Sequence, residues 1–233
     1  MLNRSVVNKI RYVLEDILSP FIRDSRLFYC LMYLMYRKKT TYLTQFRVRL
    51  PYLSKEEYGR YYQSFDSVMS DTDLNKKCID RILVETLGDR IIDVGSGRGY
   101  LANLIRQKTG KETVGCDFQI DEEIRKRYPD VQFISGDIED LPIKDKEFDT
   151  VICTHTLEHI VNFQGALNEL RRICRKKLIL VVPKEREYRY SFNLHVHFFP
   201  YLHSFLNRLH PLPKKHLCEL LDGDIFYYEL LEE

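Results

Sequence analysis

The alternation of short apolar runs with helical segments, which begins near residue 74, constrains the fold more than any other feature of the sequence. Five runs rich in β-branched and aromatic residues are predicted as strands, at 90–94, 112–116, 131–134, 148–153 and 177–182. Segments of helical period alternate with them, at 74–87, 100–108, 121–127 and 165–175. Because apolar strands separated by helices form parallel sheets with both faces covered, the pattern predicts such a sheet.

The C-terminal segment follows a different pattern. After a predicted helix at 201–209, two strand-like runs at 215–221 and 224–231 flank the dipeptide Asp222-Gly223. Asp-Gly favours a tight hairpin, because both central positions of that turn need positive φ. We therefore predict an α/β, Rossmann-like, doubly wound sheet of seven mostly parallel strands that ends in an antiparallel hairpin.

The N-terminal part is basic and is predicted to be helical. We expect a helical extension at 1–65 and the sheet domain at 66–233, and residues 1–50 contain ten Lys or Arg against three Asp or Glu. Apolar residues recur at helical spacing over 6–18, and the apolar run 27–36 would make about 15 Å of helix, half of a bilayer core of roughly 30 Å. Three interpretations stay open: a helix that is buried or covered by a partner, a helix on an anionic membrane or lipid-linked substrate, and contact with nucleic acid, for which a basic arm alone is weak evidence.

Composition narrows the class of protein. Hydrophobic residues make up 44% of the chain and charged residues 30%, which argues against intrinsic disorder. No run approaches the ~18 apolar residues of a membrane-spanning helix, and the N-terminus lacks a secretory cleavage site. The six cysteines include no C-x-x-C pair, which predicts reduced thiols rather than disulfides or a zinc site. We expect a cytoplasmic protein, peripheral to a membrane if the basic arm binds lipid.

The junction after the first predicted strand is rich in glycine. It reads Asp93-Val-Gly95-Ser-Gly97-Arg-Gly99, and glycines at alternate positions let a ligand approach the backbone closely. The helix that follows points its N-terminal amides at this space, which favours an anion. Asp117 ends the second strand and would lie beside the loop, where it could accept hydrogen bonds from ribose hydroxyls or remain a solvated carboxylate.

The order and spacing of four motifs resemble the class I S-adenosylmethionine-dependent methyltransferases, in their broad small-molecule branch. The motifs are IIDVGSGRG at 91–99, VGCDF at 114–118, ISGDIEDLP at 134–142 and FDTVICTHTLEHI at 148–160. The resemblance covers about residues 74–183 and includes the terminal hairpin. It implies S-adenosyl-L-methionine as the cofactor.

The resemblance also implies which side chains bind this cofactor. The glycines would face its methionine part, and Asp93 would order their loop. The implied set at the strand ends is Asp93, Gly95, Gly97, Gly99, Asp117, Phe118, Asp137, Ile138 and Thr154.

The adenosine part would lie against the second and third strands. By the resemblance, Asp117 binds both ribose hydroxyls and Phe118 covers the adenine. Asp137 would accept a hydrogen bond from the exocyclic amine of the adenine, and Ile138 would pack on its ring.

Three histidines are the candidate catalytic residues. Thr154 and His155 end the fourth strand, where the sulfonium and the methyl acceptor should meet. His195 and His197 would face the same side of an extended segment, and a neutral imidazole there could remove a proton from the acceptor. Packing against the sheet, with the rings bound to backbone groups, is the equal alternative for this pair.

His155 also begins the pattern His-x-x-Glu-His, which inverted zinc peptidases carry. That chemistry needs one continuous helix and a third ligand, whereas His155 is predicted to end a strand. We therefore predict no metal site.

The predicted function is in-line transfer of a methyl group to a small-molecule, glycan or lipid-linked acceptor. A nucleic-acid acceptor is not favoured, because the chain has neither an Asn/Asp-Pro-Pro-Tyr/Phe tetrapeptide nor a Pro-Cys pair. A nicotinamide-dependent oxidoreductase is an alternative, although it would not explain the G-x-G-x-G spacing. A protein that binds the cofactor without catalysis is another.

Overall fold

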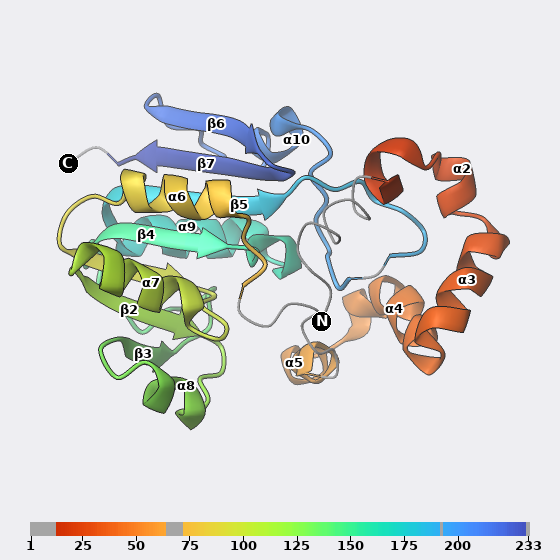
Figure 1. Cartoon of the computed structure of the whole chain (residues 1–233), viewed down its shortest axis with the longest axis horizontal. Coiled ribbons are helices and arrows are strands. Elements are labelled where there is room, and N and C mark those ends of the chain that lie inside the picture. The colour runs from red at the N-terminus through yellow and green to blue at the C-terminus, as the bar shows by residue number, and fades with distance from the viewer. Residues whose placement is uncertain (1–12, 64–71, 192, 232–233) are drawn as a thin grey trace. The chain divides into compact units, whose positions relative to one another are not determined.

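The computed structural model describes residues 13–63, 72–191 and 193–231 and divides the chain into two compact units (Figure 1). The larger unit comprises Asp71–Lys184 and Tyr201–Glu233, and the smaller comprises Met1–Ser70 and Glu185–Pro200. The predicted domain boundary between residues 65 and 66 lies outside the described residues. The segment that follows the fifth parallel strand therefore belongs to the smaller, mainly N-terminal unit.

The larger unit contains a seven-stranded sheet in the order β3-β2-β1-β4-β5-β7-β6. The first five strands pair in parallel, and β7 pairs antiparallel with both β5 and β6, so the predicted fold class is confirmed. The strands are β1 (Arg90–Val94), β2 (Glu112–Asp117), β3 (Gln132–Ser135), β4 (Phe148–Thr154), β5 (Cys174–Pro183), β6 (His216–Leu221) and β7 (Asp224–Leu230).

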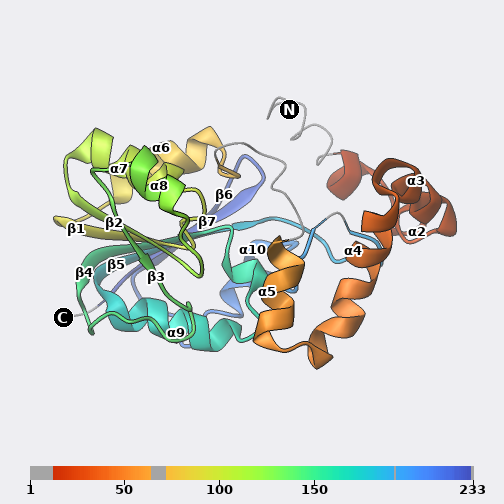
Figure 2. The same cartoon turned by 90° about the horizontal axis from the view of Figure 1, so that it is seen from below.

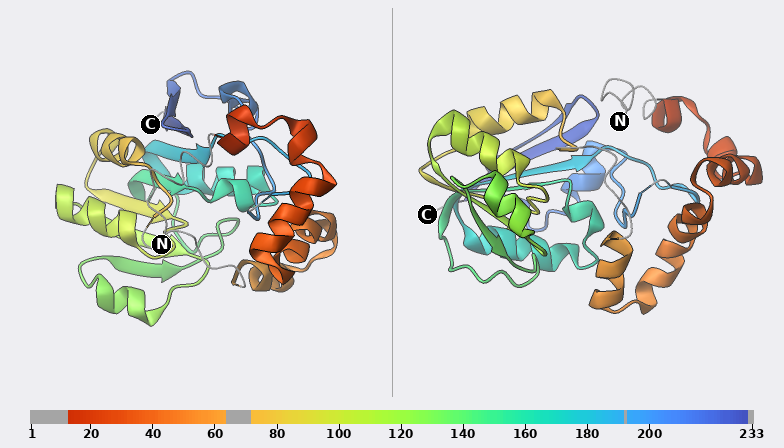
Figure 3. Two further views of the ribbon diagram at one scale, coloured as in Figure 1. Left: turned by 45° about the vertical axis from the view of Figure 1, so that its right-hand side comes forward. Right: turned by 60° about the horizontal axis from the view of Figure 1, so that its bottom comes forward.

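Helices cover both faces of this sheet (Figures 2 and 3). On one face α6 (Lys76–Glu85) and α7 (Tyr100–Thr109) bury Ile82 and Ile105 against the strands, with α8 (Glu122–Arg127) beside α7. On the other face lie α9 (Phe163–Ile173) and α10 (Leu202–Leu206). Successive side chains of β7 point to opposite faces of the sheet. Phe226 packs in the cluster with α6 and α7, and Tyr227 packs edge-on against Phe205 of α10.

Most predicted elements of this unit differ from the structure by a few residues at one end or both, and two helices illustrate this. The helix predicted at 165–175 ends at Ile173, because Cys174 already begins β5. The helix predicted at 201–209 is the shorter α10. The hairpin turn agrees with its sequence, since Asp222 and Gly223 have φ of 52° and 91°.

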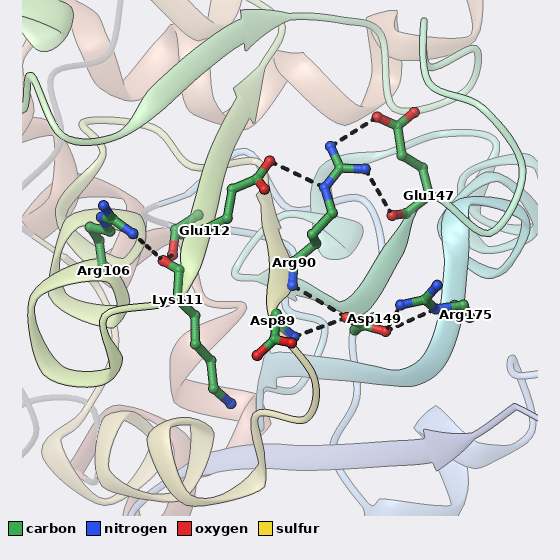
Figure 4. Close-up of polar contacts among 9 residues, drawn as sticks. Asp89, Arg90, Arg106, Lys111, Glu112, Glu147, Asp149 and Arg175 are labelled. Atoms are coloured by element: carbon green, nitrogen blue, oxygen red, sulfur yellow. Dashed lines mark hydrogen bonds and ion pairs between the residues drawn. The ribbon is translucent and has the colours of Figure 1, made fainter.

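Hydrogen bonds and ion pairs link the strands where the parallel strands begin, which we call the amino-terminal edge of the sheet (Figure 4). The opposite ends of the same strands form the carboxyl edge. The buried Asp149 carboxylate at the start of β4 accepts the backbone N–H of Asp89 at 2.9 Å and pairs with Lys176 at 2.9 Å and with Arg175. Burial raises the pKa of Asp149, but the hydrogen bonds from Arg175, from Lys176 and from the backbone outweigh it and hold this pKa well below its ordinary value.

Neighbouring strands are joined at the same edge. Arg90 contacts Glu112 at 3.1 Å and Glu147 at 3.3 Å, which links the starts of β1 and β2 to the residue before β4. This edge therefore contains matched charges, and we assign it a structural role.

The N-terminal part of the smaller unit is helical over its described residues, as predicted, whereas the described residues of Glu185–Pro200 form neither a helix nor a strand. One π-helical turn (η1, Val13–Ile17) leads to four α-helices and a 3₁₀ turn, and residues 6–12 of the predicted 6–18 helix lie outside the described residues. The elements are α2 (Pro20–Arg23), α3 (Arg26–Tyr36), α4 (Lys38–Arg49), η2 (Leu50–Tyr52) and α5 (Lys55–Gln63).

The core of this unit joins three consecutive helices to a segment that is distant in sequence. Phe28 and Met32 of α3 pack with Phe46 of α4, Tyr61 of α5 and Leu194 of the returning segment. Among the described residues, no helix combines the length and the hydropathy needed to cross a membrane.

Candidate active site

The glycine-rich loop after β1 is bound to the end of β2. Gly95 and Ser96 donate their backbone N–H groups to the carbonyl oxygen of Cys116, at 2.8 and 3.0 Å. Gly97 donates its N–H to Oδ2 of Asp117 at 2.8 Å. The structure therefore brings the loop and this carboxylate together, as the order of the predicted strands requires.

Gly97 is the position where the loop is open to a ligand. Its φ of +50° is left-handed, and a Cβ at this position would meet no atom within 4 Å. Gly99 immediately precedes α7, and no side chain caps the first turn of that helix. Uncapped amides at a helix N-terminus favour an anionic group such as the carboxylate of an amino acid.

Two buried polar atoms under the loop lack partners among the described residues. They are Oδ1 of Asp93, on β1, and Oγ of Ser96. Burial raises the pKa of Asp93 to about 7, the nearby Asp117 adds to this shift, and the N–H of Ala102 opposes it. Buried polar groups are normally paired, so these atoms indicate a site whose hydrogen bonding is incomplete.

The carboxylate of Asp117 also has a perturbed pKa. Burial raises the pKa of Asp117, while the amides of Gly97, Gln119 and Phe118 lower it. An ionised carboxylate has about four acceptor positions, so Asp117 can accept hydroxyl donors in addition to these amides. Ribose hydroxyls fit this requirement.

The predicted adenine contacts lie close to Asp117 along the chain or across the sheet. Phe118 is 64% exposed, so its ring offers apolar surface that a bound base would cover. The N–H of Gly136 donates to the carbonyl of Asp117 at 3.0 Å, which joins the ends of β2 and β3. Asp137 accepts the N–H of Glu139 at 3.0 Å and is half-buried, whereas Ile138 is already buried.

The end of β4 carries a cluster of buried charges. Thr154 is the last residue of β4, and His155 follows it with a φ of 48°. The ring of His155 has Nδ1 at 3.5 Å from Oε1 of Glu158 and Nε2 at 3.5 Å from Oδ2 of Asp224. Asn75 donates to the same Asp224 oxygen at 2.8 Å, so the hairpin and the start of α6 also contribute to the cluster.

This cluster determines the charge of His155. Burial lowers the pKa of the imidazole, but Asp224 and Glu158 outweigh burial and raise it to about 10. The raised pKa favours the imidazolium at neutral pH, in which each nitrogen carries a proton. That state suits a positive group that orders the loop after β4, and it does not suit a general base.

The structure gives the His-x-x-Glu-His pattern no helical zinc geometry. His155 follows a strand, and the next turn, η3 (Leu157–His159), is a single 3₁₀ turn. Sequence reasoning did not identify Asp224 or Asn75 as neighbours of His155, because they are far from it in the chain and no local pattern reports the contact.

His195 and His197 lie in the segment that belongs to the smaller unit. Nδ1 of His195 is 2.6 Å from Oε2 of Glu185, and Asn193 donates to the other oxygen of this carboxylate at 2.7 Å. Glu185 thus favours the tautomer with a proton on Nδ1. The predicted contribution of His195 and His197 to catalysis stays a prediction.

Comparison with known proteins agrees with the fold and the loop geometry. Residues 92–182 match a family described as a methyltransferase domain. A demethylmenaquinone methyltransferase from Thermotoga maritima is 30% identical over 115 residues, which are 48% of this chain and 50% of that protein. The chloroplastic 2-phytyl-1,4-beta-naphthoquinone methyltransferase of Arabidopsis thaliana is 31% identical over 100 residues, 38% of each chain.

A solved structure supports the same fold over a longer stretch. A SAM-dependent methyltransferase from Thermotoga maritima aligns with a TM-score of 0.51 and 16% identity, over 79% of this chain and 97% of that one. Fold, loop and family match together define a class I methyltransferase domain. Residues 92–182 therefore form a methyltransferase domain, and the chain spans about half the length of the Thermotoga maritima relative that it matches in sequence.

The cofactor of this family fits the residues at the carboxyl edge. S-adenosylmethionine offers hydroxyl groups for Asp117, a carboxylate for the start of α7 and an ammonium group as a donor near Asp93. The open surface at Gly97 allows its close approach. The family match therefore favours this cofactor over a nicotinamide, the alternative that the glycine loop alone leaves open.

Proposed function

We propose that this chain transfers a methyl group from S-adenosylmethionine to an amphiphilic small molecule, and that a hydroquinone is the first acceptor to test. The observation that carries the transferase assignment is the hydrogen bond between Gly97 and Asp117 at the carboxyl edge of a sheet matched to methyltransferase domains. The hydroquinone is supported by the names of the two relatives, both of which act on naphthoquinone-type compounds. A glycan or another lipid-linked molecule is the alternative acceptor.

The chemistry divides between the cofactor and the protein. When bound, S-adenosylmethionine supplies a methyl group on a positively charged sulfur that leaves as a neutral thioether. Asp117 and the loop at Gly97 hold the adenosine and methionine parts in fixed positions. Correct alignment of two reactants alone can lower a barrier by roughly 7–11 kcal/mol.

With a reduced aromatic acceptor, methyl transfer forms one bond, breaks one bond and releases one proton. The electron-rich ring carbon forms the new C–CH₃ bond, the S–CH₃ electron pair stays on sulfur, and the ring carbon then loses a proton. A base within reach would accept that proton. Among the predicted histidines we propose His195 for this step, because Glu185 orients its ring through Nδ1.

We assign His155 a different role within the predicted catalytic set. Since both of its nitrogens face carboxylates, we propose that it acts as a positioning residue for the loop after β4. Thr154, at the end of that strand, stays a predicted cofactor contact, as do Asp137 and Ile138.

The proposal is tested by following radioactive methyl transfer with the purified chain. The assay contains methyl-labelled S-adenosylmethionine and a short-chain demethylated naphthoquinone kept reduced by dithionite. We expect label in an organic-soluble product that co-elutes with the methylated naphthoquinone. Gly97→Ala should reduce this transfer by about tenfold or more, because its Cβ occupies the approach to the loop.

Two other outcomes would contradict parts of the proposal. Transfer of label to a glycan or another lipid extract, but not to the naphthoquinone, would replace the acceptor and keep the transferase. Binding of the cofactor without transfer to any fraction would support a protein that binds without catalysis. Consumption of a reduced nicotinamide instead would favour the oxidoreductase.

A further inference from the structure

Helix α3 has two apolar faces, and only one of them is used in the core of its unit. Phe28 and Met32 are 5% and 1% exposed and pack in the cluster with Phe46 and Tyr61. A helix with one buried and one charged face would be ordinary for a surface position. Here the second face is not charged.

The second face of α3 carries four large apolar side chains that are exposed to solvent. They lie at i, i+4, i+7 and i+8, within an arc of about 100°. Their exposed fractions are 78% for Leu27, 52% for Leu31, 76% for Leu34 and 65% for Met35. In the preceding α2, Phe21 is 87% exposed.

The charges along α3 and α4 have one sign. Between Arg26 and Arg49 the sequence contains six basic side chains and no acidic one. Arg47 is used inside the unit, where it donates to the carbonyl of Tyr188 at 2.9 Å. Arg26 and Arg37, by contrast, are exposed and lie at the two ends of the apolar stripe.

The length of α3 decides how such a helix can meet lipid. Eleven residues make about 16 Å of helix, roughly half of a hydrocarbon core, so α3 cannot span a bilayer. An apolar face flanked by basic residues instead suits a helix that lies parallel to the surface, with its apolar side chains at the boundary between head groups and acyl chains. Basic residues beside it attract anionic lipids.

We propose that α3 docks this chain on an anionic lipid surface, with Leu27, Leu31, Leu34 and Met35 inserted at the interface and Arg26 and Arg37 against the head groups. The charge complementarity selects lipid over a second copy of this chain, because two such faces would bring like charges together. The proposal does not depend on which acceptor is methylated. It would, however, bring the enzyme to the surface where an amphiphilic acceptor resides.

The test is co-sedimentation of the full chain with vesicles. One set contains phosphatidylcholine with phosphatidylglycerol, and the other contains phosphatidylcholine alone. We expect wild type to sediment with the anionic set and to be released by high salt. The double variant Leu31→Ser/Leu34→Ser should bind the anionic vesicles at least about tenfold more weakly, because two exposed leucines no longer enter the interface.

A matched control removes an equally exposed apolar side chain from the other unit. Val84 of α6 is 79% exposed, and Val84→Ser should sediment like wild type. Calorimetry with S-adenosylmethionine should give one affinity for all of these proteins, so that loss of docking is distinguished from loss of cofactor binding.

Three results would overturn the proposal. Wild type could remain in the supernatant with both vesicle sets, or the double leucine variant could sediment like wild type. A wild-type dimer that the double variant dissociates in analytical ultracentrifugation, without vesicle binding, would instead assign the face to an interface between chains.

Discussion

Carboxylates at the amino-terminal and carboxyl edges of the sheet have pKa values that are shifted in opposite directions. At the amino-terminal edge, Asp149 receives backbone N–H groups and two cationic side chains, and its pKa lies well below the ordinary value. At the carboxyl edge, burial raises the pKa values of Asp93 and Asp117, and Oδ1 of Asp93 has no partner among the described residues. The difference indicates that the first group of carboxylates is paired within the protein and that the second can accept further hydrogen bonds.

Glycines at the two edges differ in the space around them. Gly88 and Gly97 both have positive φ. A Cβ on Gly88 would strike the side chain of Asp149, whereas a Cβ on Gly97 would meet nothing within 4 Å. The first glycine allows close packing within the protein, and the second leaves surface for a ligand.

The largest expected effect on stability comes from a substitution at the amino-terminal edge. Asp149→Asn removes the charge that pairs with Arg175 and Lys176 while keeping the shape of the side chain. We expect the free energy of unfolding to fall by about 2–4 kcal/mol, because the buried position loses a charge-assisted network. Urea denaturation measures this loss. An unchanged midpoint would show that the ion pairs contribute nothing.

The two edges should also respond to pH with opposite signs. Because the pKa of folded Asp93 is raised to about 7, the folded state binds more protons than the unfolded chain from about pH 4 to 7, and stability falls as pH rises through this window. The lowered pKa of Asp149 makes stability fall instead as the pH drops below about 4.

Asp93→Asn isolates the first of these contributions. Relative to wild type, the variant should gain on the order of 2 kcal/mol between pH 5 and 8. Thermal or urea unfolding across that range measures the difference. Parallel stability curves for the two proteins would contradict the raised pKa.

The smallest expected effect concerns His155. With its pKa raised to about 10, its imidazole should stay protonated from pH 6 to about 9, and the stabilisation from its charge, complete below about pH 6.5, falls as the pH rises from there to about 10. An NMR titration of histidine-labelled protein checks this, with His155→Gln for assignment. Asp224→Asn should return the titration toward neutral pH, because one of the two facing carboxylates is gone. A midpoint near 6.5 in wild type would make His155 a candidate base again.

The sheet could be predicted from the sequence because strands and turns depend on patterns of neighbouring residues. Strand β1 has the same limits as predicted, and the turn at Asp222-Gly223 has the two positive φ angles that its residues require. The position of Asp117 beside Gly97 followed from strand order, since carboxyl ends of neighbouring parallel strands meet.

Long-range contacts could not be predicted in this way. The neighbours of His155 come from the hairpin and from the start of α6, and no periodicity reports that Asp224 and Asn75 converge there. For the same reason the segment Glu185–Pro200 was not expected to join the N-terminal helices. The apolar run 27–36 was visible, but only the packing of Phe28 and Met32 reveals which of its faces stays exposed.

The most direct test compares one carboxylate from each edge by titration calorimetry with S-adenosylmethionine. Asp117→Asn should weaken binding by about 10- to 100-fold, since ribose hydroxyls lose a charged acceptor. Asp149→Asn, assayed under conditions where it is folded, should bind as wild type does. Equal affinity of wild type and Asp117→Asn would contradict the assignment of the carboxyl edge as the cofactor site.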